Sequence, residues 1–371
     1  MPDSFEDLPL ETLFRPFTGG ELQWPDDGAL FLRARDGLPL HQQPLPGLIC
    51  EQPFKPDADA LQRAGFAVHS LEEVSLQKNY SLVLVLPPRQ RDEARALFAR
   101  AVQLARHGGR VVACISNNEG ARSGEADLEK LVGSITTASK NKCRVFWTAP
   151  LNDQINQSLL AQWLALDAVR TISDARFVSR PGVFAWDRID PASALLVKHL
   201  PTDLKGPAAD LGAGFGYLSL ELLNRCAGIT SLDAYEADAR ALNLARENLS
   251  RLQDPRPIKY EWHDVTQGLP GKYDVIITNP PFHTQSRADR PDIGKRFISV
   301  AAEALNPGGC LWLVANRHLP YEEVLNASFG QTRIVAQQDG FKIVQAVKTS
   351  ASISQPRKSR STPSPSGRGL G

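Results

Sequence analysis

The stretch NPPF at residues 279–282 places an amide and an aromatic ring on a stiff turn, directly after the apolar run VII at 275–277. The unbroken apolar run predicts a buried strand of a parallel sheet. Two prolines end that strand because neither can donate a ladder hydrogen bond, and the residue before a proline is held away from the α-helical region. Ligands of open α/β sheets bind at the carboxyl ends of the strands. We therefore expect Asn279 to present its amide to a ligand, while plain strand termination is the simpler alternative.

A second candidate site is the glycine-rich turn DLGAGFG at 210–216, which stands between a strand-like AADL and a helical YLSLELLNRC. Gly212, Gly214 and Gly216 allow a sharp turn and let a ligand approach the backbone without a Cβ in the way. The next strand-like segment, ITSLDAYE, ends in Glu236, about 20 residues beyond the last glycine, where such folds carry a ribose-binding carboxylate. The spacing therefore predicts a cofactor site, although a glycine-rich turn by itself is often only a tight loop.

The residue before the turn discriminates between two cofactors that fit this spacing, a dinucleotide and S-adenosylmethionine. A dinucleotide site has the pattern GxGxxG, whereas this turn is GxGxG preceded by Asp210. An anion at this place repels a pyrophosphate but can hold a cationic α-ammonium group, directly or through water. We therefore expect S-adenosylmethionine.

Two further acids each have two interpretations. Asp264 ends the strand-like segment IKYEWHD, where it can accept from an adenine amino group, and it can equally begin a turn. Asp238 competes with Glu236 for the ribose, but it directly precedes the helical ARALNLARENL and is better explained as a helix cap.

The elements around these residues occur twice in the chain. YDVIITNPPF, from residue 273, is followed by a helical stretch, a Gly-Gly step and the strand-like CLWLVAN, and YSLVLVLPPR, from residue 80, is followed by EARALFARAVQLARHGGRVVACIS. Matching positions of the two segments lie about 200 residues apart throughout, which indicates two copies of one α/β fold. A chance likeness between two βαβ units is the alternative.

The two copies differ where chemistry is expected. The first has LPPR at 86–89 in place of NPPF, so the amide and the ring are gone, and its nearest counterpart of the glycine turn is PGLICEQPF around Gly47. We expect an α/β protein with two tandem Rossmann-like domains. Residues 1–150 would be a degenerate domain for scaffolding or substrate binding, and 151–350 a catalytic domain that begins with a bridging helix in LNDQINQSLLAQWLALDAVR. Residues 351–371, rich in Ser, Pro and Arg, are expected to be a disordered tail.

Composition limits the partners and the compartment. The chain of 371 residues has 42 Lys and Arg against 41 Asp and Glu, a net charge of +1, so any basic surface for nucleic acid would have to be local. Its five cysteines show no CxxC pair and no histidine at metal-ligand spacing, which predicts a reduced interior and no metal. The N-terminus does not read as a signal peptide, and the apolar runs are too short to span a bilayer. We expect a cytoplasmic protein with no membrane partner.

From about 177 to 348 the sequence resembles class I S-adenosylmethionine-dependent methyltransferases, with DLGAGFG, Glu236, Asp264 and NPPF in the expected order. RPGVFAWDRIDPASALL, NPPFHTQ and the degenerate first copy further resemble the bacterial small-subunit ribosomal RNA guanine-N2 methyltransferases, the RsmC family. This likeness covers residues 40 to 348, more weakly in the first half. The tail has no counterpart in the family. The segment RPGVFAWDRID departs from the GVFS-type motif that is commoner in the family. The resemblance implies an enzyme that methylates the exocyclic N2 of a guanine in 16S ribosomal RNA, with that RNA or the 30S subunit as partner. We expect a monomer.

An amine substrate gives each residue of the NPPF turn a role. The exocyclic amine of guanine is a poor nucleophile because its lone pair is delocalised into the ring. The Asn279 side-chain oxygen and the Pro280 carbonyl can accept its two N–H groups, on a turn that reorganises little. Phe282 can stack on the base, a contact worth about 1–3 kcal/mol. His283 either relays a proton or supports the turn by a hydrogen bond.

Other segments are candidates for substrate contacts. By resemblance, the loop around Phe184 closes over the cofactor or the base, whereas DPAS at 190–193 is explained by helix capping alone. Arg287 and Arg290 follow the NPPF turn and suit RNA phosphates, with a solvated helix start as the alternative.

Two competing functions remain open. One is methylation of another amine or amide, such as a 23S ribosomal RNA guanine, a DNA adenine or a protein glutamine; enzymes for the last two usually carry Tyr where this chain has Phe282. The other is a non-catalytic RNA-binding assembly factor. The intact glycine turn, Glu236 and Asn279 argue against it.

Overall fold

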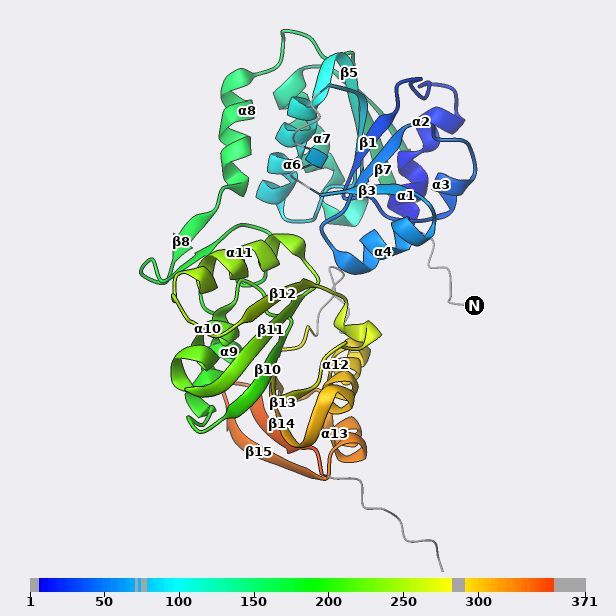
Figure 1. The fold of residues 1–371 in the computed structure, drawn as a ribbon. Helices are drawn as coiled ribbons and strands as arrows, with labels where there is room; N and C mark the ends of the chain where they lie inside the picture. Colours follow the sequence, from blue (N-terminus) through cyan, green and yellow to red (C-terminus); the bar gives the residue numbers. More distant parts are fainter. Residues whose placement is uncertain (1–6, 71–72, 75–78, 282–290, 350–371) are drawn as a thin grey trace, which may run out of the picture.

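The computed structural model describes residues 7–70, 73–74, 79–281 and 291–349, which form two α/β lobes (Figure 1). Phe282, His283, Arg287, Arg290 and the predicted tail lie outside the described residues. Within the described part, no helix has both the length and the apolar character needed to cross a membrane.

The N-terminal lobe is built on a seven-stranded sheet with the strand order β3-β2-β1-β4-β5-β7-β6 in the described residues. Neighbouring strands are parallel except at β7, which runs antiparallel to β5 and β6. Its elements are α1 (Leu8–Leu13), α2 (Arg15–Thr18), β1 (Ala29–Leu32), α3 (Leu38–His41), β2 (Leu48–Glu51), α4 (Lys55–Arg63), β3 (Ala67–His69), β4 (Tyr80–Val85), α6 (Arg91–Leu104), β5 (Ala105–Ser116), η1 (Asn117–Glu119), α7 (Ala121–Val132), β6 (Ile135–Lys140) and β7 (Cys143–Thr148).

A connecting segment and the C-terminal lobe follow. The connecting segment contains α8 (Gln157–Leu164), η2 (Ala165–Asp167) and the hairpin β8 (Arg170–Ile172) and β9 (Phe177–Ser179). The elements of the second lobe are α9 (Pro191–His199), β10 (Lys205–Leu211), α10 (Tyr217–Arg225), β11 (Gly228–Glu236), α11 (Ala239–Ser250), β12 (Ile258–Trp262), η3 (Val265–Gln267), β13 (Tyr273–Thr278), α12 (Pro291–Ala304), β14 (Leu305–Asn316), α13 (Glu322–Ser328), β15 (Gln331–Gln338) and β16 (Phe341–Val347).

The second sheet repeats the topology of the first, with the order β12-β11-β10-β13-β14-β16-β15 and a single antiparallel reversal at β16. Equivalent details recur as well. Gly108 and Gly308 both have positive φ, and their N–H groups donate to the carbonyls of Leu151 and Lys348, at 2.7 and 2.6 Å. Two copies of one fold, predicted from the faint sequence repeat, are confirmed.

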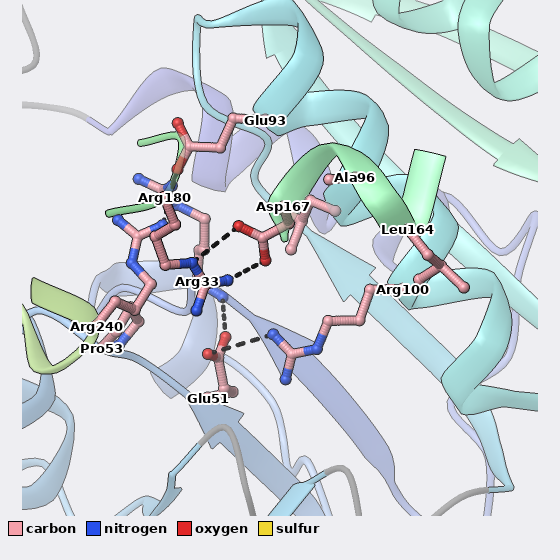
Figure 2. Close-up of a pocket in the computed structure, with 11 residues that line it drawn as sticks. Arg33, Glu51, Pro53, Glu93, Ala96, Arg100, Leu164, Asp167, Arg180 and Arg240 are labelled. Carbon is pink, nitrogen blue, oxygen red and sulfur yellow. Dashed lines mark hydrogen bonds and ion pairs between the residues drawn. The ribbon is translucent and has the colours of Figure 1, made fainter. Parts of the chain in front are cut away.

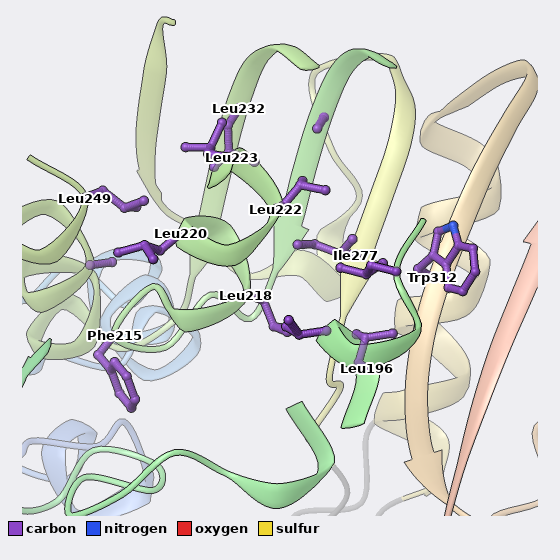
Figure 3. Packing of buried hydrophobic residues seen from close by; sticks show 14 of the residues in the cluster. Leu196, Phe215, Leu218, Leu220, Leu222, Leu223, Leu232, Leu249, Ile277 and Trp312 are labelled. Atoms are coloured by element: carbon purple, nitrogen blue, oxygen red, sulfur yellow. The ribbon is translucent and has the colours of Figure 1, made fainter. Parts of the chain in front are cut away.

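Each sheet is the middle of three layers. In the second lobe, α9, α10 and α11 cover one face, and their leucines pack against strand residues such as Leu232, Ile277 and Trp312 (Figure 3). Helices α12 and α13 cover the other face. Strand β13 is therefore buried on both sides, as its apolar run predicted, so its carboxyl end is held rigidly.

The helix expected as a bridge, α8, packs on the N-terminal lobe. Its Trp163 is buried in the same cluster as Phe98 of α6, and the Arg95 guanidinium lies over the indole, 5.4 Å from the ring centroid. This packing assigns α8 to the first core, so the boundary that we propose moves from near residue 150 to the segment after Asp167.

Candidate active site

The two predicted loops leave adjacent strands at the carboxyl edge of the second sheet. In the parallel pair β10 and β13, Asp210 lies opposite Ile277 and Leu211 opposite Thr278. The buried Thr278 hydroxyl donates to the Leu211 carbonyl at 2.7 Å, which ties the glycine turn to the Asn-Pro-Pro turn. Strand β11, on the other side of β10, delivers Glu236 to the same edge.

Asp210 is fully buried beneath the glycine turn. Its Oδ2 accepts from the Ser219 hydroxyl at 2.7 Å, whereas its Oδ1 has no hydrogen-bond partner among the described residues. Burial raises the pKa of Asp210 to about 7, and nearby Glu236 adds to the rise, while the Ser219 hydrogen bond opposes it. A buried acceptor with one free oxygen is suited to a cationic or hydrogen-bonding ligand.

The glycine turn is open at its tip and closed at its base. Gly214 has φ +57°, and a Cβ built there would meet no atom within 4 Å, so its backbone faces open space. Gly216 has φ +90°, and a Cβ there would lie 3.2 Å from the Ala245 Cα. Gly216 therefore allows the start of α10 to pack against α11, while Gly214 leaves room for a ligand.

Glu236 holds the tip of this turn in place. Its Oε2 accepts from Gly214 N at 2.7 Å, and its Oε1 accepts from Asp238 N at 2.8 Å. Burial raises its pKa, and the Asp238 charge adds to the rise, while the backbone hydrogen bonds lower it. Each carboxylate oxygen has two acceptor sites, so both can still accept from the two hydroxyls of a ribose.

The orientation of the Asn279 amide is fixed by helix α9. Its Nδ2 donates to Asp190 Oδ2 at 3.0 Å and to Ser193 Oγ at 2.9 Å. A carboxylate oxygen has no hydrogen to donate, so the nitrogen of the amide must be the atom on that side. The side-chain oxygen of Asn279 is thereby turned away from α9 and left as an acceptor. Pro280, the next residue of the turn, is buried.

Asp190 was expected only as a helix cap, and it is one. Its Oδ2 accepts from Ser193 N at 2.8 Å, and Pro191 is the first residue of α9. The same oxygen also binds Asn279, a role that the sequence analysis missed for Asp190 and Ser193 because it joins residues almost 90 positions apart. The sequence DPAS was enough to predict the helix cap, whereas the hydrogen bonds from this segment to Asn279 could not be predicted from the sequence.

The two ambiguous acids act as caps. Asp238 precedes α11 and accepts from Arg240 N at 2.9 Å, which confirms its capping role. Asp264 begins η3 and accepts from the backbone N–H and the hydroxyl of Thr266, at 2.9 and 2.7 Å. The turn interpretation of Asp264 is therefore confirmed, and its adenine contact stays a prediction.

Phe184 lies at the mouth of the site. It is 61% exposed, and it lines a cleft of about 700 Å³ together with Gly214 and Glu236. The opposite wall of this cleft comes from the N-terminal lobe, including Leu86, Pro88 and Arg89 of the first copy's turn. The cleft thus joins the carboxyl edges of both sheets.

The structure corrects the predicted counterpart of the glycine turn in the first copy. Strand β1 occupies the place of β10, so the equivalent loop is Arg33-Ala34-Arg35, whereas the segment around Gly47 leads into β2, the equivalent of β11. The sequence comparison failed because the equivalent loop, RARDG at 33–37, has lost the first two glycines of the turn and keeps only Gly37, which precedes α3 as Gly216 precedes α10. Strand β2 ends in Glu51, which accepts from Arg33 N at 3.2 Å, as Glu236 accepts from Gly214 N.

The retained acid of the first copy is neutralised. Arg100 Nη1 lies 3.6 Å from Glu51 Oε1, and the surrounding space is crowded by Arg33, Arg180 and Arg240 (Figure 2). The remaining cavity is only about 70 Å³. This cavity is much smaller than the cleft of about 700 Å³ beside Glu236, so Glu51 lacks the room for a ribose.

Comparisons with known proteins agree with this geometry. Residues 174–345 match the family model "Methyltransferase small domain". The chain is 30% identical over 290 residues to a "Ribosomal RNA small subunit methyltransferase C" of Shewanella sp. (strain MR-4), covering 78% of this chain and 82% of the relative. It is 32% identical to the protein of the same name from Idiomarina loihiensis, over 56% of this chain and 61% of that relative, less than two thirds of its length.

A solved structure has the same two-lobed fold. The 16S rRNA N2 methyltransferase RsmC of T. thermophilus, in complex with AdoMet and guanosine, matches with a TM-score of 0.75 and 24% identity, over 93% of each chain. The likeness extends through the N-terminal lobe as well as the C-terminal one.

Proposed function

Because the chain belongs to the ribosomal RNA small subunit methyltransferase C family, we propose that it transfers a methyl group from S-adenosylmethionine to the exocyclic N2 of a guanine in 16S ribosomal RNA. The observation that carries the proposal is the fixed amide of Asn279. Both of its N–H groups are used by Asp190 and Ser193, so its oxygen is an acceptor aimed from a rigid turn. An acceptor in this place selects a substrate with an N–H group to donate.

The residues at the carboxyl edge fit S-adenosylmethionine. Asp210 Oδ1, buried without a partner among the described residues, suits its ammonium group directly or through water, and Glu236 suits its ribose hydroxyls. A Cβ on Gly214 would meet no atom within 4 Å, so the turn leaves open space beside its bond to Glu236. Asp264 would accept from the adenine amine. When bound, the cofactor supplies an electrophilic methyl group.

The protein's part in the reaction is to hold the amine. The Asn279 oxygen and the Pro280 carbonyl accept its two hydrogens, which turns the nitrogen lone pair away from the ring and towards the methyl donor. Because Asn279 is already oriented, little reorganisation accompanies the reaction. The nitrogen sheds its proton after methylation, so no strong base is required. Phe282 would stack on the base, and His283 would relay the proton or support the turn.

The RNA is proposed to cross the cleft between the lobes. Phe184 stands exposed at its mouth, and Arg287 and Arg290 would contact phosphates near the reacting base. We propose ribosomal RNA, free or in the 30S subunit, as the partner, a monomeric state and a cytoplasmic location. The first domain, up to about Asp167, would act as a scaffold and the second as the catalytic domain.

Methyl transfer to purified ribosomal RNA tests the proposal. With labelled S-adenosylmethionine we expect label in 16S RNA, and nuclease digestion with mass spectrometry should identify N2-methylguanosine. Label in 23S RNA, in DNA adenine or in protein would move the substrate to one of the alternatives. A chain that binds RNA but not S-adenosylmethionine would instead be an assembly factor.

A further inference from the structure

The N-terminal lobe binds the backbone that directly follows Glu236. Lys55 N donates to the Ala237 carbonyl at 2.8 Å, and Ala239 N donates to the Pro53 carbonyl at 2.9 Å, which pairs Phe54 with Asp238 as an antiparallel bridge. The lobes are therefore joined at the turn that carries the ribose-binding carboxylate.

A charge network reinforces the same turn. Glu93, in the first turn of α6, accepts from Arg240 Nη1 at 3.0 Å, and Arg240 in turn donates from Nη2 to Asp238 Oδ2 at 2.8 Å (Figure 2 shows Glu93 and Arg240). The side chains of Glu93 and Arg240 are only 12% and 16% exposed, so this ion pair is shielded from solvent. Arg240 lies between the two carboxylates. Burial is the main cause of the raised pKa of Glu236, and the Asp238 charge that adds to it is paired with Arg240.

Glu93 also contacts the other wall of the site. A Cβ built on Gly182, whose φ is +85°, would lie 2.5 Å from Glu93 Oε1. Arg240 Nη2 is 3.5 Å from the Gly182 carbonyl. Gly182 begins the loop that carries Phe184. One carboxylate of the first lobe thus lies against both segments that border the cofactor site.

We infer that Glu93 is a positioning residue for the methyl donor: through Arg240 it fixes the 236–238 turn, so the degenerate lobe sets the cofactor affinity of the catalytic lobe. This inference rests on the proposed function for the identity of the cofactor. Glu93 belongs to the helix that follows the first copy's Leu-Pro-Pro-Arg turn. The helix next to the lost catalytic turn has thereby acquired a role at the neighbouring active site.

The inference separates affinity from turnover. Glu93 reaches Glu236 through Arg240 and Asp238, but no described hydrogen bond links it to Asn279, Asp190 or Ser193. Loss of Glu93 should therefore raise KM for S-adenosylmethionine and leave kcat on RNA nearly unchanged.

The test compares Glu93→Ala, Glu93→Gln and Arg33→Gln in the full chain. Arg33 Nη1 donates to the same Glu93 oxygen at 2.9 Å, whereas among the described residues no hydrogen bond or ion pair links Arg33 to the 236–240 turn, so Arg33→Gln is the matched control. S-adenosylmethionine binding is measured by calorimetry without RNA, and KM and kcat are measured with RNA. We expect Glu93→Ala to weaken binding about tenfold, Glu93→Gln about threefold because it keeps a neutral acceptor, and Arg33→Gln less than about twofold.

The outcomes separate the two hypotheses. Wild-type chain that binds no S-adenosylmethionine overturns the proposed function and this inference with it. Wild-type binding that Glu93→Ala leaves unchanged overturns the inference alone. An equal loss in Arg33→Gln, or a fall in kcat without a change in KM, also overturns it, because either result indicates general loosening of the lobes. Backbone amide exchange of Asp238 and Ala239 in the cofactor-free protein should be faster in Glu93→Ala, which checks the turn without any activity.

Discussion

The Nδ2 atom of Asn279 lies 3.0 Å from Asp190 Oδ2, the same oxygen that caps helix α9. The cap and the candidate catalytic amide therefore share one acceptor. Asp190 cannot satisfy the helix end without also being in place for Asn279, so the start of α9 fixes which way the amide points.

Asn279→Ala should lower kcat on ribosomal RNA by about 10²–10³, as the loss of a pre-aimed transition-state contact does in other enzymes. Cofactor affinity should stay within about twofold of wild type, because none of the described contacts of Asn279 reaches Asp210 or Glu236. Single-turnover methyl transfer and calorimetry measure the two quantities. Near-normal turnover would exclude the amine-holding role. As the matched gain test, Leu86→Asn in the first copy should create no second activity.

Glu236→Ala should weaken S-adenosylmethionine binding by about tenfold or more, since charge-assisted hydrogen bonds contribute about 1.5–3 kcal/mol each. Glu51→Ala, the equivalent change in the first copy, should leave the affinity and a stoichiometry of one unchanged because Arg100 already neutralises Glu51. Calorimetry on both folded variants measures the affinity for S-adenosylmethionine and the number of sites per chain. A second site, or equal effects of the two changes, would contradict the assignment.

Cofactor affinity should rise with pH between about 6 and 8. Burial raises the pKa of Asp210 from 3.8 to about 7, so the free protein holds a proton on this group at pH 6, whereas a cationic ligand favours the ionised form. The affinity should fall by up to about tenfold per pH unit below 7.

The raised pKa of Asp210 also lowers the free energy of unfolding of the cofactor-free protein as pH rises from 3.8 to about 7, because the folded chain binds the proton more tightly than the unfolded chain. Asp210→Asn should bind weakly at every pH and lose both dependences, which calorimetry and urea titrations at several pH values can check.

Trp262→Phe should lower the free energy of unfolding by about 1 kcal/mol, the net contribution of a typical hydrogen bond. The indole N–H of Trp262 is shared between the carbonyls of Pro53 and Ala237, at 3.0 and 2.8 Å, and so bridges the lobes. The loss stays small because both carbonyls keep their backbone donors. Urea denaturation measures the change. A loss of more than about 3 kcal/mol would mean that the ring, rather than its N–H, holds the junction.

The sequence predicted the catalytic lobe well because its signals are local. The apolar run before NPPF, the glycines after Asp210 and the acid at the end of β11 are each readable within one short segment. Parallel strands bring their carboxyl ends to one edge, so the order of these segments was enough to place them together.

Contacts between distant segments were not predictable in the same way. The bond from Asn279 to Asp190 depends on how α9 packs, and the pairing of Phe54 with Asp238 depends on how two lobes meet. Glu51 was missed for a different reason. Once the loop at Arg33 had kept only Gly37 of its three glycines, no local pattern marked the strand that precedes it as the equivalent of β10.

The bridge between the lobes is made by main-chain atoms of Pro53, Lys55, Ala237 and Ala239. Backbone carbonyls and amides are nearly the same in every residue type. The residues of this bridge can therefore be substituted without breaking it, provided that no proline replaces a donor. An inserted or deleted residue, in contrast, would shift the register and separate the copies. Selection on the junction should therefore act on segment length more than on composition, and a duplicated domain can lose its own chemistry and still be retained by its neighbour.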